Sequence, residues 1–161
     1  MKKLKIYIDT SAIGYLDEQE SPKEMSEMRL LWKLIKQGLY EVVISPVVTD
    51  ELMANKNMEK LNKLLGFLKE IEYSVIEITD EIHDIAKSVI QNGILTEKSY
   101  NDCLHISCAI SSNCDVLVSF NFKHMVNVRT IKGVRAISNL KGYANLDIVQ
   151  AIALIQEGGD G

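Results

Sequence analysis

Short apolar runs alternate with longer amphipathic segments along this chain. Several of the runs are short and apolar rather than alternating, as in strands that a parallel sheet buries on both faces. They predict strands at residues 3–8, 41–44, 73–78, 116–119 and 134–137. The intervening segments predict a helix that Ser45 caps and Pro46 begins, and further helices at residues 23–37, 57–70, 80–91 and 99–113. This alternation predicts a three-layer α/β/α sandwich around a mainly parallel sheet.

The composition fits one globular domain over residues 1–161. A hydrophobic content of 47% with 25% charged residues excludes a disordered chain. No apolar segment approaches the ~20 residues that a membrane-spanning helix needs, and the first residues lead directly into a strand rather than a signal-peptide core. The cysteines are odd in number and lack Cys-x-x-Cys spacing, which is typical of reduced, buried thiols: Cys103, Cys108 and Cys114. We expect a cytoplasmic protein with no membrane partner.

Three acidic residues occupy positions where an uncompensated charge is costly. Asp9 ends the first predicted strand, and Glu51 and Asp102 share helical stripes with apolar residues. Because the ligands of parallel sheets gather at the carboxyl ends of strands, Asp9 and Ser119 are both candidates for a site there. Carboxylate oxygens suit hard divalent cations, so the three acids predict a site for Mg²⁺ or Mn²⁺.

Each acid also has a simpler interpretation. Asp9 is suited to cap a following helical turn, and Asp102 to interact with a helix dipole in the first turn. Glu51 lies on the apolar face of its helix with Val48, whereas Asp50 is the solvated acid. One acid alone would be weak support, but three on separate elements favour a metal site.

The charge of this chain is unevenly distributed. The net charge is −4, yet no acid occurs between Asp115 and Asp147, where five basic residues fall: Lys123, Arg129, Lys132, Arg135 and Lys141. This segment is either an ordinary solvated surface or a basic rim that contacts phosphates. His105, one turn after Asp102, has either a packing role or a ligand or catalytic role. His124, after the fourth strand, is placed where it could reach a phosphate.

The order and spacing of these motifs resemble a PIN domain over residues 3–148. The likeness rests on Asp9-Thr10-Ser11 after the first strand, the Glu51 helix, Asp102-x-x-His105, and Ser119-x-Asn121 after the fourth strand. It is strongest with the VapC-like ribonuclease toxins that carry Asn-Phe-Lys-His, here residues 121–124. The resemblance implies a five-stranded parallel sheet in the order 3-2-1-4-5.

The resemblance also implies functional roles. Asp9, Glu51 and Asp102 correspond to the family acids that hold Mg²⁺ or Mn²⁺, with Thr10 or Ser11 as the hydroxyl after the first acid and Ser119 as the hydroxyl after the fourth strand. Asn121 stands where many members carry a further acid, and its amide oxygen would orient water without adding charge. The implied activity is metal-dependent hydrolysis of RNA that leaves 5′-phosphates and 3′-hydroxyls. The implied partner is an antitoxin, with a homodimer as a further possibility through the helices at 23–37 and 57–70.

Two other functions fit the same residues. One is a PIN-like module that binds RNA or protein and cleaves weakly, because Asn121 lowers the charge of the site. The other is a small-molecule phosphohydrolase, for which the basic segment extends further than a small substrate needs. Metal-dependent RNA cleavage that the Asp9→Asn variant loses would separate them.

Overall fold

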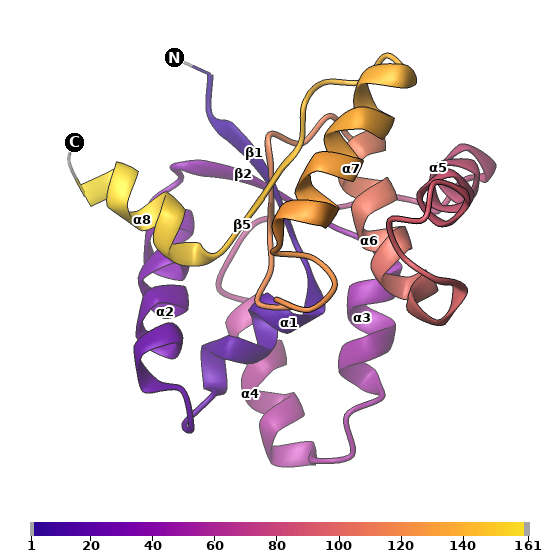
Figure 1. Cartoon of the computed structure of the whole chain (residues 1–161). Helices are drawn as coiled ribbons and strands as arrows, with labels where there is room; N and C mark the ends of the chain where they lie inside the picture. The colour runs from indigo at the N-terminus through magenta and orange to yellow at the C-terminus, as the bar shows by residue number, and fades with distance from the viewer. Residues whose placement is uncertain (1, 160–161) are drawn as a thin grey trace.

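The structure, a computed structural model, describes residues 2–159, with the side chains of residues 2–155 (Figure 1). Its five strands are β1 (Leu4–Ile8), β2 (Tyr40–Ile44), β3 (Ser74–Val75), β4 (Val116–Val118) and β5 (Asp147–Val149). All neighbouring strands pair in parallel, in the order β3-β2-β1-β4-β5. The predicted sheet order is confirmed.

Helices cover both faces of this sheet. They are α1 (Thr10–Gly14), α2 (Pro22–Lys36), α3 (Pro46–Met53), α4 (Met58–Leu68), α5 (Asp80–Gln91), α6 (Tyr100–Ser111), α7 (Val128–Leu140) and α8 (Ala151–Gly159), with short 3₁₀ turns η1 (Tyr15–Asp17) and η2 (Glu97–Ser99). Figure 1 shows α5, α6 and α7 together on one side of the sheet, and α2 beside α8 on the other. The three-layer α/β/α sandwich is confirmed. Over the described residues, every helix is too short or too polar to cross a lipid bilayer.

The prediction of a fifth strand at residues 134–137 is wrong. This segment lies within α7, and the fifth strand is instead Asp147–Val149. Val134 and Ile137 are both buried and three residues apart, which places them on one face of a helix. Asn127 begins α7 by accepting a hydrogen bond from the Thr130 N–H at 2.9 Å. The helical spacing of the buried residues therefore decides the structure of this segment, which is part of α7.

The third strand is shorter than the predicted 73–78. In the structure β3 spans Ser74 and Val75, which lie opposite Val43 and Ile44 of β2, and both are exposed at the edge of the sheet. A very short edge strand offers few unpaired backbone groups to other chains.

The apolar stripes considered for a dimer face are used inside the chain. Met28, Leu31, Trp32 and Ile35 of α2 are buried, as are the apolar positions of α4, which are Leu61, Leu64 and Leu68. Gly38 ends α2 with a φ of +83°, a conformation that other residues adopt at a cost. Since core packing accounts for these stripes, the homodimer stays a prediction.

The register of the central strands sets the position of the site. Ile8 of β1 is level with Val118 of β4, so the residues that follow them emerge side by side at the carboxyl edge. The Asp9 N–H donates to Val118 O at 3.2 Å, and the Ser119 N–H donates to Val149 O at 3.0 Å. This edge, between strands from which the chain proceeds in opposite directions, is where such sheets bind ligands.

Candidate metal and phosphodiester site

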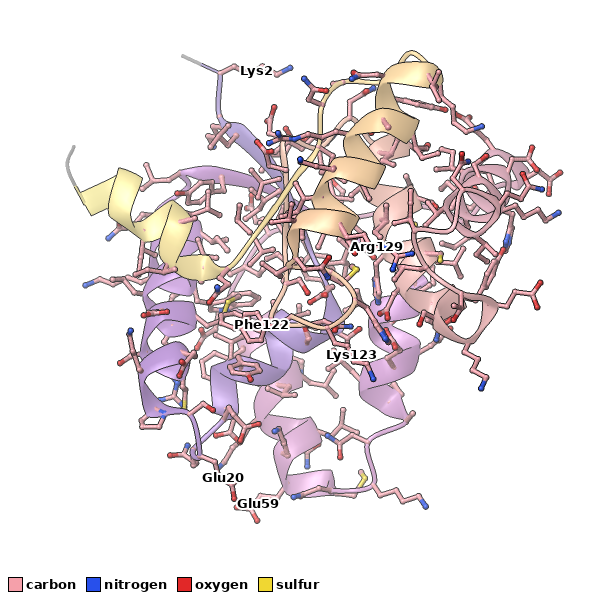
Figure 2. All side chains as sticks on the ribbon, viewed as in Figure 1. Lys2, Glu20, Glu59, Phe122, Lys123 and Arg129 are labelled. Carbon is pink, nitrogen blue, oxygen red and sulfur yellow. The ribbon has the colours of Figure 1, made fainter. Side chains whose placement is uncertain are left out.

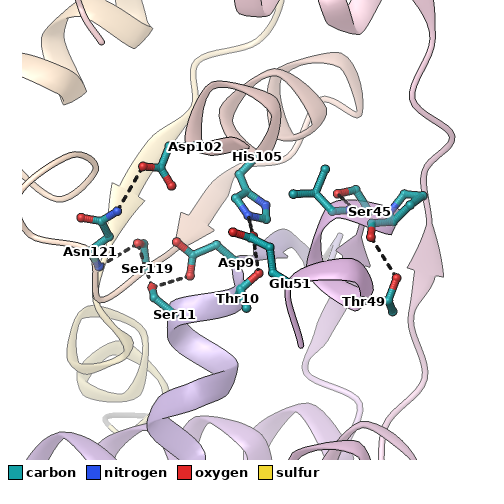
Figure 3. Close-up of polar contacts among 12 residues, drawn as sticks. Asp9, Thr10, Ser11, Ser45, Thr49, Glu51, Asp102, His105, Ser119 and Asn121 are labelled. Carbon is teal, nitrogen blue, oxygen red and sulfur yellow. Dashed lines mark hydrogen bonds and ion pairs between the residues drawn. The ribbon is translucent and has the colours of Figure 1, made fainter. Parts of the chain in front are cut away.

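Asp9 is a buried carboxylate with two roles. Its Oδ1 accepts the Ala12 N–H at 2.9 Å and so caps α1. The side chain is nevertheless at the carboxyl edge of the sheet, beside Ser119 (Figure 3). Burial raises the pKa of Asp9, and its interactions with His105, Ser119, Ser11 and the Ala12 N–H offset that rise only in part. The helix-cap interpretation and the site interpretation are thus compatible.

Two serines hold the Asp9 carboxylate from different strand ends. The Ser11 hydroxyl donates to Asp9 Oδ1 at 2.7 Å and accepts the Phe120 N–H at 3.0 Å. Ser119 is buried, its Oγ lies 3.3 Å from the Ser11 Oγ, and it accepts the Asn121 N–H at 3.0 Å. The position of the Asp9 carboxylate is therefore fixed from both β1 and β4.

Glu51 lies on α3 and is held through one oxygen. Thr10 Oγ1 donates to Glu51 Oε1 at 2.7 Å, and His105 Nε2 lies 2.6 Å from the same oxygen. Burial tends to raise the pKa of Glu51. The interactions with His105, Thr10 and Asn101 outweigh burial and lower that pKa below its ordinary value. Glu51 is therefore ionised at neutral pH, and Asp50 is exposed, as predicted.

His105 belongs to a buried hydrogen-bonded chain behind Glu51. Its Nδ1 lies 2.7 Å from the Tyr7 hydroxyl, which lies 2.8 Å from Ser45 Oγ. Tyr7 and Ser45 are fully buried, and His105 is 2% exposed. Both ring nitrogens of His105 therefore have a partner, and the ring cannot turn without breaking one of these bonds. This geometry makes His105 a positioning residue for Glu51.

Asp102, at the start of α6, faces the loop after β4. His124 Nδ1 lies 3.1 Å from Asp102 Oδ2, and the Asn121 Nδ2 donates to the same oxygen at 3.4 Å. The amide oxygen of Asn121 accepts the His124 N–H at 3.1 Å. The Asn121 amide thus presents its nitrogen, rather than its oxygen, to the acid.

The three acids meet at one edge of the sheet from three separate elements (Figure 3). Glu51 and Asp102 line a pocket of about 430 Å³, and the other residues that line it are Lys98, Ser99, Tyr100, Asn101 and His124. Among the described side chains, no Lys or Arg forms an ion pair with Asp9, Glu51 or Asp102. The basic side chains that contact Glu51 and Asp102 in that part of the chain are His105 and His124, respectively.

The donor set has the chemistry that a hard divalent cation requires. Three carboxylates and the Ser119 hydroxyl supply oxygen donors, and a buried carboxylate without a Lys or Arg partner favours a cation nearby. Within residues 2–155, however, no three acidic, His or Cys side chains are closely enough grouped to form a finished metal site. Glu51 contacts Thr10 and His105 through Oε1, and Asp102 contacts Asn121 and His124 through Oδ2, so the second oxygen of each carboxylate is the one that would face a cation.

The sequence indicates the three acids and the nearby hydroxyls of Thr10 or Ser11 and Ser119, but not the other groups that contact the acids. It did not find the roles of Tyr7, Ser45 and Asn101, and it left His105 and His124 undecided. The sequence signals for these partners were weak. Tyr7 contributes one hydroxyl to an otherwise apolar strand end. The three-residue spacing of Asp102 and His105 shows only that they share one helix face. The residues that contact one another are far apart in the sequence: Tyr7 and His105 are separated by 98 positions, and Glu51 and His105 by 54.

The fold and the acidic edge together define a doubly wound α/β protein with a carboxylate site at its topological switch point. The family model described as "PIN domain" matches residues 6–128. Because that match covers most of the chain, this protein belongs to the PIN domain family. A comparison with curated proteins finds no match.

Solved structures share this fold at low sequence identity. VapBC2 from Rickettsia felis, bound to a DNA fragment from its promoter, is similar at 21% identity with a TM-score of 0.54, covering 90% of this chain and 97% of that one. VapC20 from Mycobacterium tuberculosis, a toxin that cleaves the sarcin-ricin loop, is similar at 14% identity with a TM-score of 0.56. The match covers 74% of this chain and 92% of VapC20. VapBC-1 from nontypeable Haemophilus influenzae is similar at 17% identity with a TM-score of 0.56, and the match covers 92% of this chain and 99% of that one.

Proposed function

We propose that this protein is a metal-dependent endoribonuclease and the toxin of a toxin–antitoxin pair. The observation that carries the proposal is the meeting of Asp9, Glu51 and Asp102 at the carboxyl edge of the sheet, with no Lys or Arg paired to them among the described side chains. Mg²⁺ or Mn²⁺ would be held by Asp9 and Asp102, with Glu51 binding directly or through water. The solved toxin that cleaves the sarcin-ricin loop lends support through a shared fold.

The residues around the acids divide the work of hydrolysis. Ser11 and Ser119 keep the Asp9 carboxylate aimed at the edge, and Thr10 with His105 keeps Glu51 ionised and oriented. A bound divalent cation supplies charge that polarises the phosphodiester and lowers the pKa of the attacking water. One carboxylate of the site accepts the proton of that water, and Asn121 positions the loop that carries His124.

The partner that we propose is an antitoxin, as in the VapC-like toxins that the sequence resembles. Two of the similar structures are VapBC proteins, and one of these is bound to promoter DNA. A small neighbouring gene for a DNA-binding protein would be the genomic sign of such a pair. Three free, buried cysteines accord with a cytoplasmic location.

The activity is tested with end-labelled single-stranded RNA. We expect cleavage with Mg²⁺ or Mn²⁺, none with EDTA, and fragments that carry a 5′-phosphate and a 3′-hydroxyl. RNA binding without cleavage under every metal condition would instead identify a binding module. Hydrolysis of small phosphate esters with intact RNA would identify a small-molecule phosphohydrolase.

Asn121→Asp is expected to tighten Mn²⁺ binding on the order of tenfold. The variant places a second carboxylate beside Asp102, where the Asn121 nitrogen now lies at 3.4 Å, and two adjacent carboxylates favour a cation. Calorimetric titration measures the affinity, and cleavage should begin at a lower metal concentration. Asn139→Asp adds the same charge at an exposed position of α7 and is the control. Equal affinities for the two variants would show that Asn121 is not beside the metal.

A further inference from the structure

A second pocket adjoins the one that Glu51, Asp102 and Lys98 line, and the strong charges on its walls are positive. Its volume is about 230 Å³, and its polar walls come from Ser99, Lys123, His124, Asn127, Arg129 and Thr130. Ser99 and His124 also line the pocket that contains Glu51 and Asp102, so the two pockets share a wall. No Asp or Glu is among the described residues that line the second pocket.

The two strong cations of this pocket are available to a ligand. Lys123 and Arg129 are exposed, and neither forms an ion pair with any side chain in the described part of the chain. Figure 2 places Lys123 on the loop before α7 and Arg129 at the start of that helix. The Arg129 Nη2 donates to Gly93 O at 2.8 Å, which anchors the guanidinium while its other N–H groups remain for an anion.

The backbone that carries these cations is held firmly. The Asn127 Nδ2 donates to Lys123 O at 3.0 Å, and Thr130 Oγ1 donates to His124 O at 2.8 Å. Ile94 lines the opposite wall of the pocket and packs closely against Gly133 of α7, since a Cβ added to Gly133 would lie 2.6 Å from Ile94 Cγ1. A preorganised cationic pocket binds an anion at a lower entropic cost than mobile lysines do.

We propose that this pocket binds a phosphate of the RNA backbone next to the phosphodiester that is cleaved. The inference rests on the proposed ribonuclease activity and extends it to a substrate subsite. An RNA strand carries a phosphate at every nucleotide, so a strand at the pocket that Glu51 and Asp102 line presents its neighbouring phosphate to an adjoining pocket. His124 lies at the junction, with Asp102 Oδ2 at 3.1 Å and Ser99 Oγ at 3.4 Å from its Nδ1.

The test compares a dinucleotide, which has only the scissile phosphate, with a hexanucleotide. For Lys123→Gln, and for the double variant with Arg129→Gln, KM for the hexanucleotide should rise, on the order of tenfold in the double variant, with kcat little changed. Cleavage of the dinucleotide should stay as in the unmodified protein. Lys132→Gln, an exposed charge on the same helix outside the pocket, is the matched control. The thermal midpoint checks folding, because Arg129 also contacts Gly93.

Direct RNA binding provides a readout that does not depend on catalysis. The dependence of log K on log salt for the hexanucleotide should become shallower by about 0.7 for each lost phosphate contact. Unchanged binding and KM in the double variant, with normal cleavage, would overturn the subsite and leave the proposed function intact. Failure of the unmodified protein to cleave RNA would overturn the proposed function. The comparison of hexanucleotide binding by the unmodified protein and the double variant would then decide whether the pocket binds a phosphate. Weaker binding of a polyglutamate peptide, with RNA binding unchanged, would assign the pocket to an acidic protein segment and overturn the proposal.

Discussion

Asp9→Asn is expected to lower RNA cleavage by about a thousandfold or more while the fold is retained. The asparagine oxygen still accepts the Ala12 N–H and the Ser11 hydroxyl, so the cap of α1 survives. What disappears is the buried negative charge that we propose as a metal ligand. Cleavage of end-labelled RNA measures the effect. Asp50→Asn, the same chemical change at an exposed acid of α3, should leave the rate unaltered.

The same variant should be at least as stable as the unmodified protein in metal-free buffer. Burial raises the pKa of Asp9 in the folded state, so the folded protein binds the proton more tightly than the unfolded chain does. The unmodified protein therefore loses stability as the pH rises from about 3.8 through that raised pKa, and Asp9→Asn lacks this loss. Urea unfolding at several pH values with EDTA measures it. Substantial cleavage by a folded Asp9→Asn variant would refute the assignment of Asp9.

His105→Ala is expected to lower cleavage on the order of a hundredfold, because Glu51 loses the partner that orients it. The variant also leaves the buried Tyr7 hydroxyl with Ser45 alone and opens a cavity, at a cost of about 1–3 kcal/mol in unfolding free energy. His105→Gln should recover part of the activity, since an amide N–H is able to donate to Glu51. Ser107→Ala, a buried change on the same helix whose hydroxyl bonds only Cys103 O, is the control.

A pH profile separates positioning from a general loss of stability. Interactions with His105 lower the pKa of Glu51 against the opposing effect of burial, so their removal raises that pKa. The acidic limb of the rate profile should move to higher pH in His105→Ala and stay in place in Ser107→Ala. The stability that ionised Glu51 contributes is present above its ordinary pKa of 4.5 and is lost as the pH falls through its lowered folded value. An unmoved acidic limb in His105→Ala would count against the positioning role.

Local patterns were reliable where a single element decided the outcome. Ser45 caps α3 with Pro46 at its first position, Gly38 ends α2, and the helix at residues 80–91 has the predicted bounds. These features depend on periodicity and caps within a few residues of each other. The prediction failed at residues 134–137, where the strand-like segment Val-Arg-Ala-Ile belongs to a longer helical period that continues to Ser138.

The basic segment shows how folding sorts residues that look equivalent in sequence. Lys123 and Arg129 line the pocket beside the acids, whereas Arg135 pairs with Asp147 of β5. Lys132, three residues after Arg129, lies outside the pocket. The sequence alone indicates the same role for all of these basic residues, because charge spacing does not reveal what each side chain faces.

The sequence by itself determined the α/β class, most of the helices and the identity of the three acids, because periodicity, caps and the cost of burying charge are properties of local segments. The tertiary structure alone decided which groups hold those acids: Ser119 on Asp9, Thr10 and His105 on Glu51, and His124 on Asp102. Those contacts join residues 22 to 110 positions apart. They form only when parallel strands bring their carboxyl ends to one edge of the sheet, and no local pattern encodes that convergence.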